Sequence, residues 1–162
     1  MRVVYANDTL ETSIFLAGPT PRSESVPSWR PQAIQLIEAA GFKGTVYTPE
    51  TSNNDWNHEY YNQIEWEWSA LQMSTVVLFW VPRELTDMPA FTTNVEFGYL
   101  ANSGKVMLGH PEGAPKMRYL ESLAFRHNIP VYNDLEVMVT HAVARTKRPY
   151  RSPVLKFEDT NE

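Results

Sequence analysis

The residues of this sequence best suited to chemistry are two glutamates, Glu96 and Glu67. Glu96 ends the segment TNVE at 93–96, where the loop after a predicted strand enters a predicted helix. One interpretation is a capping box, in which Thr93 caps the helix and Glu96 bonds back to the backbone N–H of the cap. The other is a carboxylate at the mouth of a sheet. There the N-terminus of the helix would lower its pKa and keep it ionised as a nucleophile.

Glu67 lies in the segment QIEWEW at 63–68, which is predicted to be helical. On a helix, Glu67 shares a face with Gln63, Ala70 and Leu71, and this partly apolar face is expected to turn toward the sheet. Glu65 falls on another face and is expected to be solvated. A carboxylate on a partly apolar face is either a satisfied structural group or a proton-transfer group with a raised pKa.

Other residue types give weaker signals. The loop GPTPRS at 18–23 has neither of the glycine-rich phosphate signatures. Arg22 and Arg30 could meet an anion, although solvation at the surface is the preferred interpretation. The four histidines lack metal-ligand spacing, and only His110 is a pocket candidate. Gly98 is costly inside a helix, which a close approach by another backbone would explain.

Two tryptophans and a basic cluster also have ordinary interpretations. Trp56 and Trp80 are expected to pack against other residues, with stacking on a nucleobase as the alternative. The basic residues of 145–151 are expected to belong to a solvated tail, with a contact across a subunit interface as the alternative.

The elements that must position these residues are short apolar runs alternating with amphipathic stretches. The spacing predicts strands over 13–17, 45–48, 75–81, 105–109 and 129–132, and helices over 27–40, 59–73, 94–102, 116–127 and 135–145. Ser28 is the expected N-cap of the first helix, and Gly41 its expected C′ residue. This alternation predicts a parallel sheet covered on both faces. Ligands of such sheets bind beyond the carboxyl ends of the strands, here at the loops 18–27, 49–57, 82–94 and 109–115.

Composition limits the classes of function. The 162 residues fit one domain over 1–150 with a polar tail over 151–162. The net charge of −5 argues against binding nucleic acid without regard to its sequence, which needs a cationic surface. Because there is no cysteine, disulfides and thiolate chemistry are excluded. No apolar run is long enough to span a membrane, and no signal peptide is evident, so we expect a cytoplasmic protein.

Five segments in a fixed order carry a family resemblance. They are IFLAGP at 14–19, Trp29 with GFKGTVYTPE at 41–50, WE at 66–67, VLFWVP at 77–82 and TTNVEFG at 92–98. Together the segments resemble the nucleoside 2-deoxyribosyltransferase-like family, from about residue 14 to residue 115. The resemblance implies a flavodoxin-like three-layer α/β sandwich with a five-stranded parallel sheet. It also implies no metal, no cofactor and a homo-oligomer.

The resemblance also assigns roles. It implies that Glu96 is the nucleophile and that Glu67 is the acid/base carboxylate, where many relatives carry Asp. Some relatives have an Asp shortly before the nucleophile and a Tyr on the first strand, for which this sequence offers Thr92 or Asn94 and Phe15. Together with the predicted loops, the resemblance leads us to expect six substrate-binding residues: Gly18, Pro19, Glu50, Trp56, Thr92 and Asn94.

The implied reaction exchanges the base of a 2′-deoxynucleoside for a free nucleobase, through a deoxyribosyl ester on Glu96 and with net retention. The implied partners are these small molecules, without nucleic acid or membrane. One alternative is an N-hydrolase of deoxynucleosides or their 5′-monophosphates, because the similar deoxynucleotide N-glycosidases use water as acceptor. An alternative of another class is a non-catalytic nucleotide-sensing module, and a flavodoxin-like electron carrier is more distant.

Overall fold

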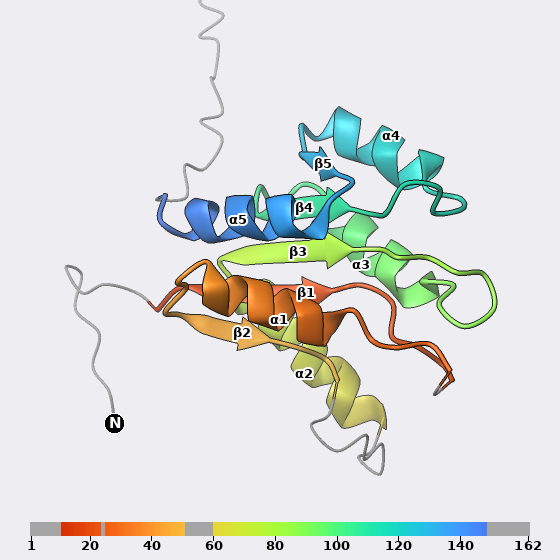
Figure 1. The fold of residues 1–162 in the computed structure, drawn as a ribbon, viewed down its shortest axis with the longest axis horizontal. Helices are drawn as coiled ribbons and strands as arrows, with labels where there is room; N and C mark the ends of the chain where they lie inside the picture. The colour runs from red at the N-terminus through yellow and green to blue at the C-terminus, as the bar shows by residue number, and fades with distance from the viewer. Residues whose placement is uncertain (1–10, 24, 51–59, 149–162) are drawn as a thin grey trace, which may run out of the picture.

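The described part of the chain forms one parallel sheet between two layers of helices (Figure 1). The computed structural model describes residues 11–23, 25–50 and 60–148, apart from the side chains of 60 and 61. Within these ranges the strand order is β2-β1-β3-β4-β5. The strands are β1 (Ser13–Ala17), β2 (Thr45–Tyr47), β3 (Val76–Trp80), β4 (Val106–Gly109) and β5 (Val131–Tyr132). This order is that of flavodoxin-like folds, so the expected three-layer α/β sandwich is confirmed.

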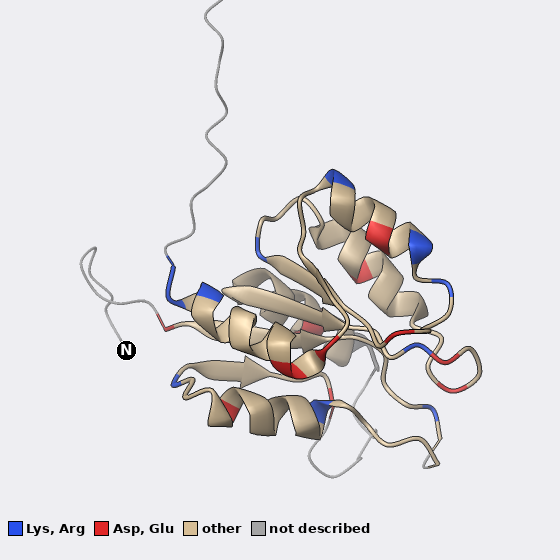
Figure 2. Cartoon of the chain, turned by 45° about the horizontal axis from the view of Figure 1, so that its top comes forward, with Lys and Arg blue, Asp and Glu red and all other residues tan. Residues whose placement is uncertain are grey.

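The helices divide between the two faces of the sheet because successive strand residues point to opposite faces. They are α1 (Arg30–Ala39), α2 (Tyr60–Met73), α3 (Phe91–Leu100), α4 (Arg118–Arg126) and α5 (Leu135–Thr146). Ile14 and Leu16 of β1 pack with α1 and α5 in one core cluster. Phe15 and Ala17 pack with α2, α3 and α4 in the other. The five strands carry no charged residue (Figure 2), and the three central strands β1, β3 and β4 are buried throughout, as expected for strands covered on both faces.

The sheet reverses its strand order between β1 and β3. β1 pairs with β2 on one side and with β3 on the other, with Phe15 opposite Tyr47 and Ala17 opposite Phe79. The connections from β1 and β3 therefore diverge at their carboxyl ends, where such folds leave a crevice for ligands. Within the described ranges, no helix is both long and apolar enough to cross a membrane.

The local predictions for α3 need correction. The helix begins at Phe91, not at 94, because Ala90 takes a left-handed conformation (φ 62°) at the N-cap position. Thr93 is therefore a buried residue inside the helix, and the predicted capping box does not form. Gly98 is exposed, and a side chain there would meet no described atom outside its own helix within 4 Å, so the expected close approach does not come from the described part of this chain.

The predictions for the ends of α1 are partly correct. The N-cap is Trp29 rather than Ser28, although the Ser28 hydroxyl accepts a hydrogen bond from the Arg30 backbone N–H at 3.1 Å. A proline in the first turn suits this start because its missing N–H needs no partner there. Gly41 follows the helix with a φ of +74°, a conformation typical of the C′ position.

Candidate active site

A cavity of about 220 Å³ opens at the carboxyl ends of β1 and β3. Its walls come from β1 and the loop that follows it, from the segment after β2, from α2, and from the start of α3 with the loop that leads into it. The residues that line it are Phe15, Ala17, Gly18, Pro19, Thr20, Arg22, Pro49, Gln63, Ile64, Glu67, Pro89, Ala90, Phe91, Thr92, Thr93 and Glu96. The cavity thus lies where the reversal of strand order predicts a ligand. It brings both candidate carboxylates to one space.

Glu96 projects into the cavity from α3 and is 8% exposed. Burial and, to a smaller extent, the negative charge of Glu67 together raise its pKa from 4.5 to about 7, against the opposing positive charge of Arg30. The expectation that a helix N-terminus lowers this pKa is therefore wrong. Glu96 lies in the second turn of a helix that begins at Phe91, so desolvation outweighs the helix dipole.

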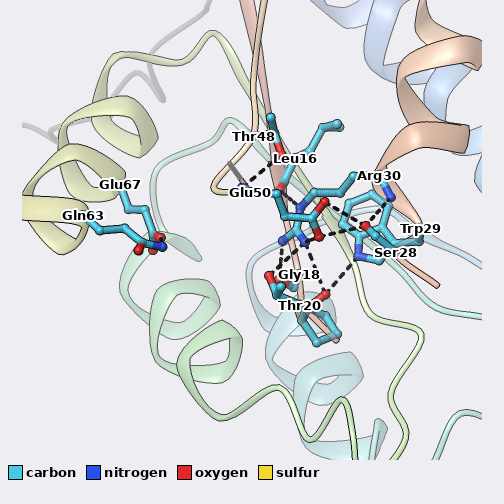
Figure 3. A network of polar contacts seen from close by, with 11 residues as sticks. Leu16, Gly18, Thr20, Ser28, Trp29, Arg30, Thr48, Glu50, Gln63 and Glu67 are labelled. Carbon is cyan, nitrogen blue, oxygen red and sulfur yellow. Dashed lines mark hydrogen bonds and ion pairs between the residues drawn. The ribbon is translucent and has the colours of Figure 1, made fainter. Parts of the chain in front are cut away.

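Glu67 projects into the same cavity from α2 and is half-buried (Figure 3). Burial raises the pKa of this carboxyl, as expected for a proton-transfer group. Two effects oppose the shift: Gln63 Nε2 donates a hydrogen bond to Glu67 Oε1 at 2.9 Å, and Arg30 contributes its positive charge. Gln63 lies one turn before Glu67, so the predicted shared face is what allows this bond. Glu65 is exposed, as expected.

Three of the expected substrate-binding residues line the cavity: Gly18, Pro19 and Thr92. Gly18 has no alternative there, because a Cβ would lie 2.1 Å from the Trp80 carbonyl oxygen. Phe15 also lines the cavity and offers no hydroxyl.

Two of the other expected residues, Glu50 and Asn94, are not among those that line the cavity. The Glu50 carboxylate pairs with Arg30 at 2.7 Å. The Asn94 side chain accepts a hydrogen bond from the guanidinium of Arg83, which is itself buried. Trp56 lies outside the described residues.

Arg30 departs furthest from the sequence-based expectation. Solvation was the preferred interpretation, but the side chain is 1% exposed and lies beneath the loop that follows β1 (Figure 3). Its guanidinium donates to the carbonyl oxygens of that loop and pairs with Glu50. No local pattern signals this position, because every residue to which the guanidinium donates a hydrogen bond is at least ten residues away in the sequence.

The remaining candidates take structural roles. His110 is buried, and its Nε2 pairs with Glu121 at 2.9 Å outside the cavity, so its selection as a pocket residue is wrong. Trp80 packs in the core, as expected. Arg22 lines the cavity, with its guanidinium carbon 5.6 Å from the centre of the Phe91 ring. Among the described residues, no group of three or more His, Asp or Glu side chains is arranged to hold a metal ion.

Comparison with solved structures identifies the same fold elsewhere. A conserved protein from Enterococcus faecalis V583 superimposes with a TM-score of 0.59 at 15% sequence identity. The match covers 84% of this chain and 99% of that one. No curated protein sequence matches this chain. At the level of sequence families, the model described as "Nucleoside 2-deoxyribosyltransferase like" matches residues 11–114. Because this match covers well over half of the 162 residues and includes both candidate carboxylates, the chain belongs to the nucleoside 2-deoxyribosyltransferase-like family.

Proposed function

We propose that this protein is a nucleoside 2-deoxyribosyltransferase, which transfers the deoxyribosyl group of a 2′-deoxynucleoside from one nucleobase to another. The observation that carries the proposal is the pair Glu96 and Glu67, projecting from two different helices into one cavity. A retaining glycosyl transfer uses two carboxyl groups at one substrate site, one as nucleophile and the other as acid/base. Membership of the family supports the substrate class.

In the first step, a carboxylate oxygen of Glu96 attacks C1′ of the sugar. The C1′–N bond breaks, its electron pair goes to the base, and the carboxyl proton of Glu67 neutralises the departing base. The product is a deoxyribosyl ester of Glu96. In the second step, a ring nitrogen of the incoming base attacks C1′ and loses its proton to Glu67, which frees the Glu96 carboxylate. Two inversions give net retention.

This mechanism has a definite pH requirement. Glu96 must be ionised for the attack, although burial and the charge of Glu67 raise its pKa to about 7. Glu67 must hold a proton, which its raised pKa favours. Because the negative charge of one carboxylate raises the pKa of the other, the two titrate as a coupled pair, and the reactive form carries one proton between them. The rate at low substrate concentration is therefore expected to follow a bell-shaped pH profile whose alkaline limb lies near pH 7, where the pair loses its last proton.

The test is a chromatographic assay with deoxyinosine or thymidine as donor, with and without adenine or cytosine as acceptor. A new deoxynucleoside that forms only with the acceptor supports the proposal. Free base released at the same rate with or without acceptor would contradict it and favour a hydrolase. Tight binding of deoxynucleosides or their monophosphates without turnover would favour a nucleotide-sensing module, and in that case binding should be indifferent to Glu96→Gln.

One observation favours the hydrolase of 5′-monophosphates as the second candidate. Arg22 is the cationic residue among those that line the cavity, and the neighbouring hydroxyls of Ser23 and Ser25 lie 2.8 Å apart. An arginine in the cavity suits a phosphate, and the two serines follow it in the same loop. Assaying thymidine 5′-monophosphate beside thymidine distinguishes the candidates. Preference for the monophosphate that is lost in Arg22→Gln would support the hydrolase.

We also propose that a second copy of this chain covers the exposed side of α3. Phe91, Val95 and Tyr99 recur at four-residue spacing there and are each more than 60% exposed. Phe91 also lines the cavity, so a partner on this row would close the site. A dimer or larger oligomer in light-scattering measurements that is lost in Val95→Glu supports the proposal. A monomer at micromolar concentration would contradict it.

A further inference from the structure

A network of hydrogen bonds centred on the buried Arg30 holds the segment that forms one wall of the cavity (Figure 3). Arg30 is the first residue of α1, and its guanidinium reaches back to the end of β1. Nε donates to the Leu16 carbonyl oxygen at 3.1 Å, and Nη2 donates to that of Gly18 at 2.6 Å. Nη1 donates to the Pro19 carbonyl oxygen at 3.4 Å and to Thr20 Oγ1 at 3.0 Å. One side chain thus engages four residues of a five-residue segment.

The guanidinium is also paired with a carboxylate, through the same Nη1 that donates to Pro19 and Thr20. Glu50 Oε1 lies 2.7 Å from Arg30 Nη1. The Ser28 hydroxyl lies 2.7 and 2.9 Å from the two carboxylate oxygens of Glu50 and accepts the backbone N–H of Arg30. A buried arginine and its carboxylate are therefore paired, as burial of a charge demands. This pairing accounts for the position of Glu50 outside the cavity.

The geometry needs an arginine. A guanidinium presents five donors in one plane, whereas a lysine ammonium is a point charge that cannot reach carbonyl oxygens in several directions at once. The carbonyl oxygens that Arg30 engages belong to the segment whose other atoms form the cavity wall at Gly18, Pro19 and Thr20. Trp29 adds a bond from its Nε1 to the Pro19 carbonyl oxygen at 3.1 Å. Side chains at the start of α1, and not only residues of the wall segment itself, thus hold the wall in position.

We propose that Arg30 is the positioning residue of this site: its guanidinium holds the wall at 18–20 and supplies the buried positive charge that acts on Glu96 and Glu67. This inference rests on the proposed function, because it takes these two carboxylates as the reacting groups. Arg30 acts on the site in two ways: it fixes the position of the wall, and its positive charge acts on the two carboxylates. Glu50 and Ser28 keep it in place.

The charges around Glu96 fix the direction of the electrical effect. Glu67 acts from α2 and raises the pKa of Glu96, while Arg30 acts from α1 and lowers it. Arg22, from the loop after β1, lines the same cavity. Glu50 is paired with Arg30, so its negative charge partly offsets the field of the guanidinium. Removing Arg30 should therefore raise the pKa of Glu96, and removing the charge of Glu50 should lower it.

Three substitutions separate the two roles of Arg30. Arg30→Lys keeps the charge and loses the planar set of donors, so kcat/KM should fall by roughly 10²-fold because the wall is misplaced, while the acid limb of the pH profile stays near that of the wild type. Arg30→Met loses both, so the acid limb should also move to higher pH. Glu50→Gln should move it to lower pH.

The matched control is Arg145→Met. Arg145 also donates to backbone carbonyl oxygens, those of Gly104 and Val106, but these lie at the amino end of β4, opposite the cavity. This variant should keep the wild-type pH profile whatever its effect on stability. Should Arg30→Met fail to fold by circular dichroism, Arg30→Lys and Glu50→Gln still carry the test, because they predict a rate loss without a shift and a shift of known sign.

The titration of Glu96 can also be followed without turnover, by NMR of the protein labelled with ¹³C at the glutamate carboxyl carbons. This distinguishes failure of the inference from failure of the proposed function. An inactive wild type whose Glu96 still shifts upward in Arg30→Met and downward in Glu50→Gln would refute the transferase alone. Wild-type kcat/KM in Arg30→Lys, or an unmoved Glu96 titration in both other variants, would overturn the role of Arg30.

Discussion

Replacing Glu96 with glutamine should stabilise the fold at alkaline pH while it removes the proposed nucleophile. Burial and the charge of Glu67 raise the pKa of this carboxyl from 4.5 to about 7 in the folded protein. The unfolded chain therefore releases this proton at lower pH than the folded one does. The group contributes stability that is fully present below about pH 4.5 and is lost as pH rises through about 7.

The size of this effect follows from the same pKa values. A difference of one unit between the pKa values of the folded and unfolded chains corresponds to about 1.4 kcal/mol. The shift from 4.5 to about 7 therefore means that ionised Glu96 costs the fold about 3 kcal/mol above pH 8. Glutamine has nearly the same shape and no charge, so it avoids this cost. The gain in unfolding free energy from Glu96→Gln should thus be roughly 2–3 kcal/mol larger at pH 8.5 than at pH 5.

Urea denaturation of both proteins at the two pH values measures this difference directly. Glu65→Gln is the matched control, because Glu65 is exposed on α2 and its substitution should change stability by less than about 0.5 kcal/mol at either pH. An effect of Glu96→Gln that is the same at pH 5 and pH 8.5, or a loss of stability at pH 8.5 alone, would show that folding does not raise the pKa of Glu96.

Three further predictions concern the same cavity. Glu67→Gln removes a negative charge and the general acid, so the pKa of Glu96 should fall below about 7, the pH profile of kcat/KM should lose its alkaline limb, and turnover should fall about 10²–10⁴-fold. Gln63→Leu removes the bond to Glu67, so the pKa of that carboxyl should rise and the alkaline limb should move to higher pH. Gly18→Ala should lower the unfolding free energy by about 3 kcal/mol in thermal or urea denaturation, because its Cβ would overlap a carbonyl oxygen. Gly41→Ala, with space around it, should cost only about 1 kcal/mol.

Much of the fold could be predicted because its signals are local. The strands Ser13–Ala17 and Val76–Trp80 are uninterrupted apolar runs, and the turn after each is marked by glycine or proline. The start of α3 could not be predicted in the same way. Thr93 has the residue type of a cap, but the left-handed conformation of Ala90 begins the helix at Phe91. That conformation depends on the surrounding loop and not on the residue type.

The carboxylates of the candidate site could be named from the sequence, but their electrostatics could not. The pKa of Glu96 depends on burial and on Glu67, which is 29 positions away in the sequence. The role of Arg30 depends on carbonyl oxygens that precede it and on a carboxylate that follows it. Such effects depend on tertiary structure, because the sequence shows that a residue is charged but not whether its side chain meets water or a buried partner.

In the proposed reaction, Glu96 becomes covalently bonded to the sugar. Mass spectrometry of the protein quenched in acid during turnover of a 2′-deoxynucleoside, followed by digestion and peptide sequencing, detects such a bond. We expect a deoxyribosyl group on the carboxyl of Glu96, absent from Glu96→Gln and released as a new deoxynucleoside when acceptor base is added before the quench. Turnover that persists in Glu96→Gln, or a sugar found on another residue, would contradict this expectation.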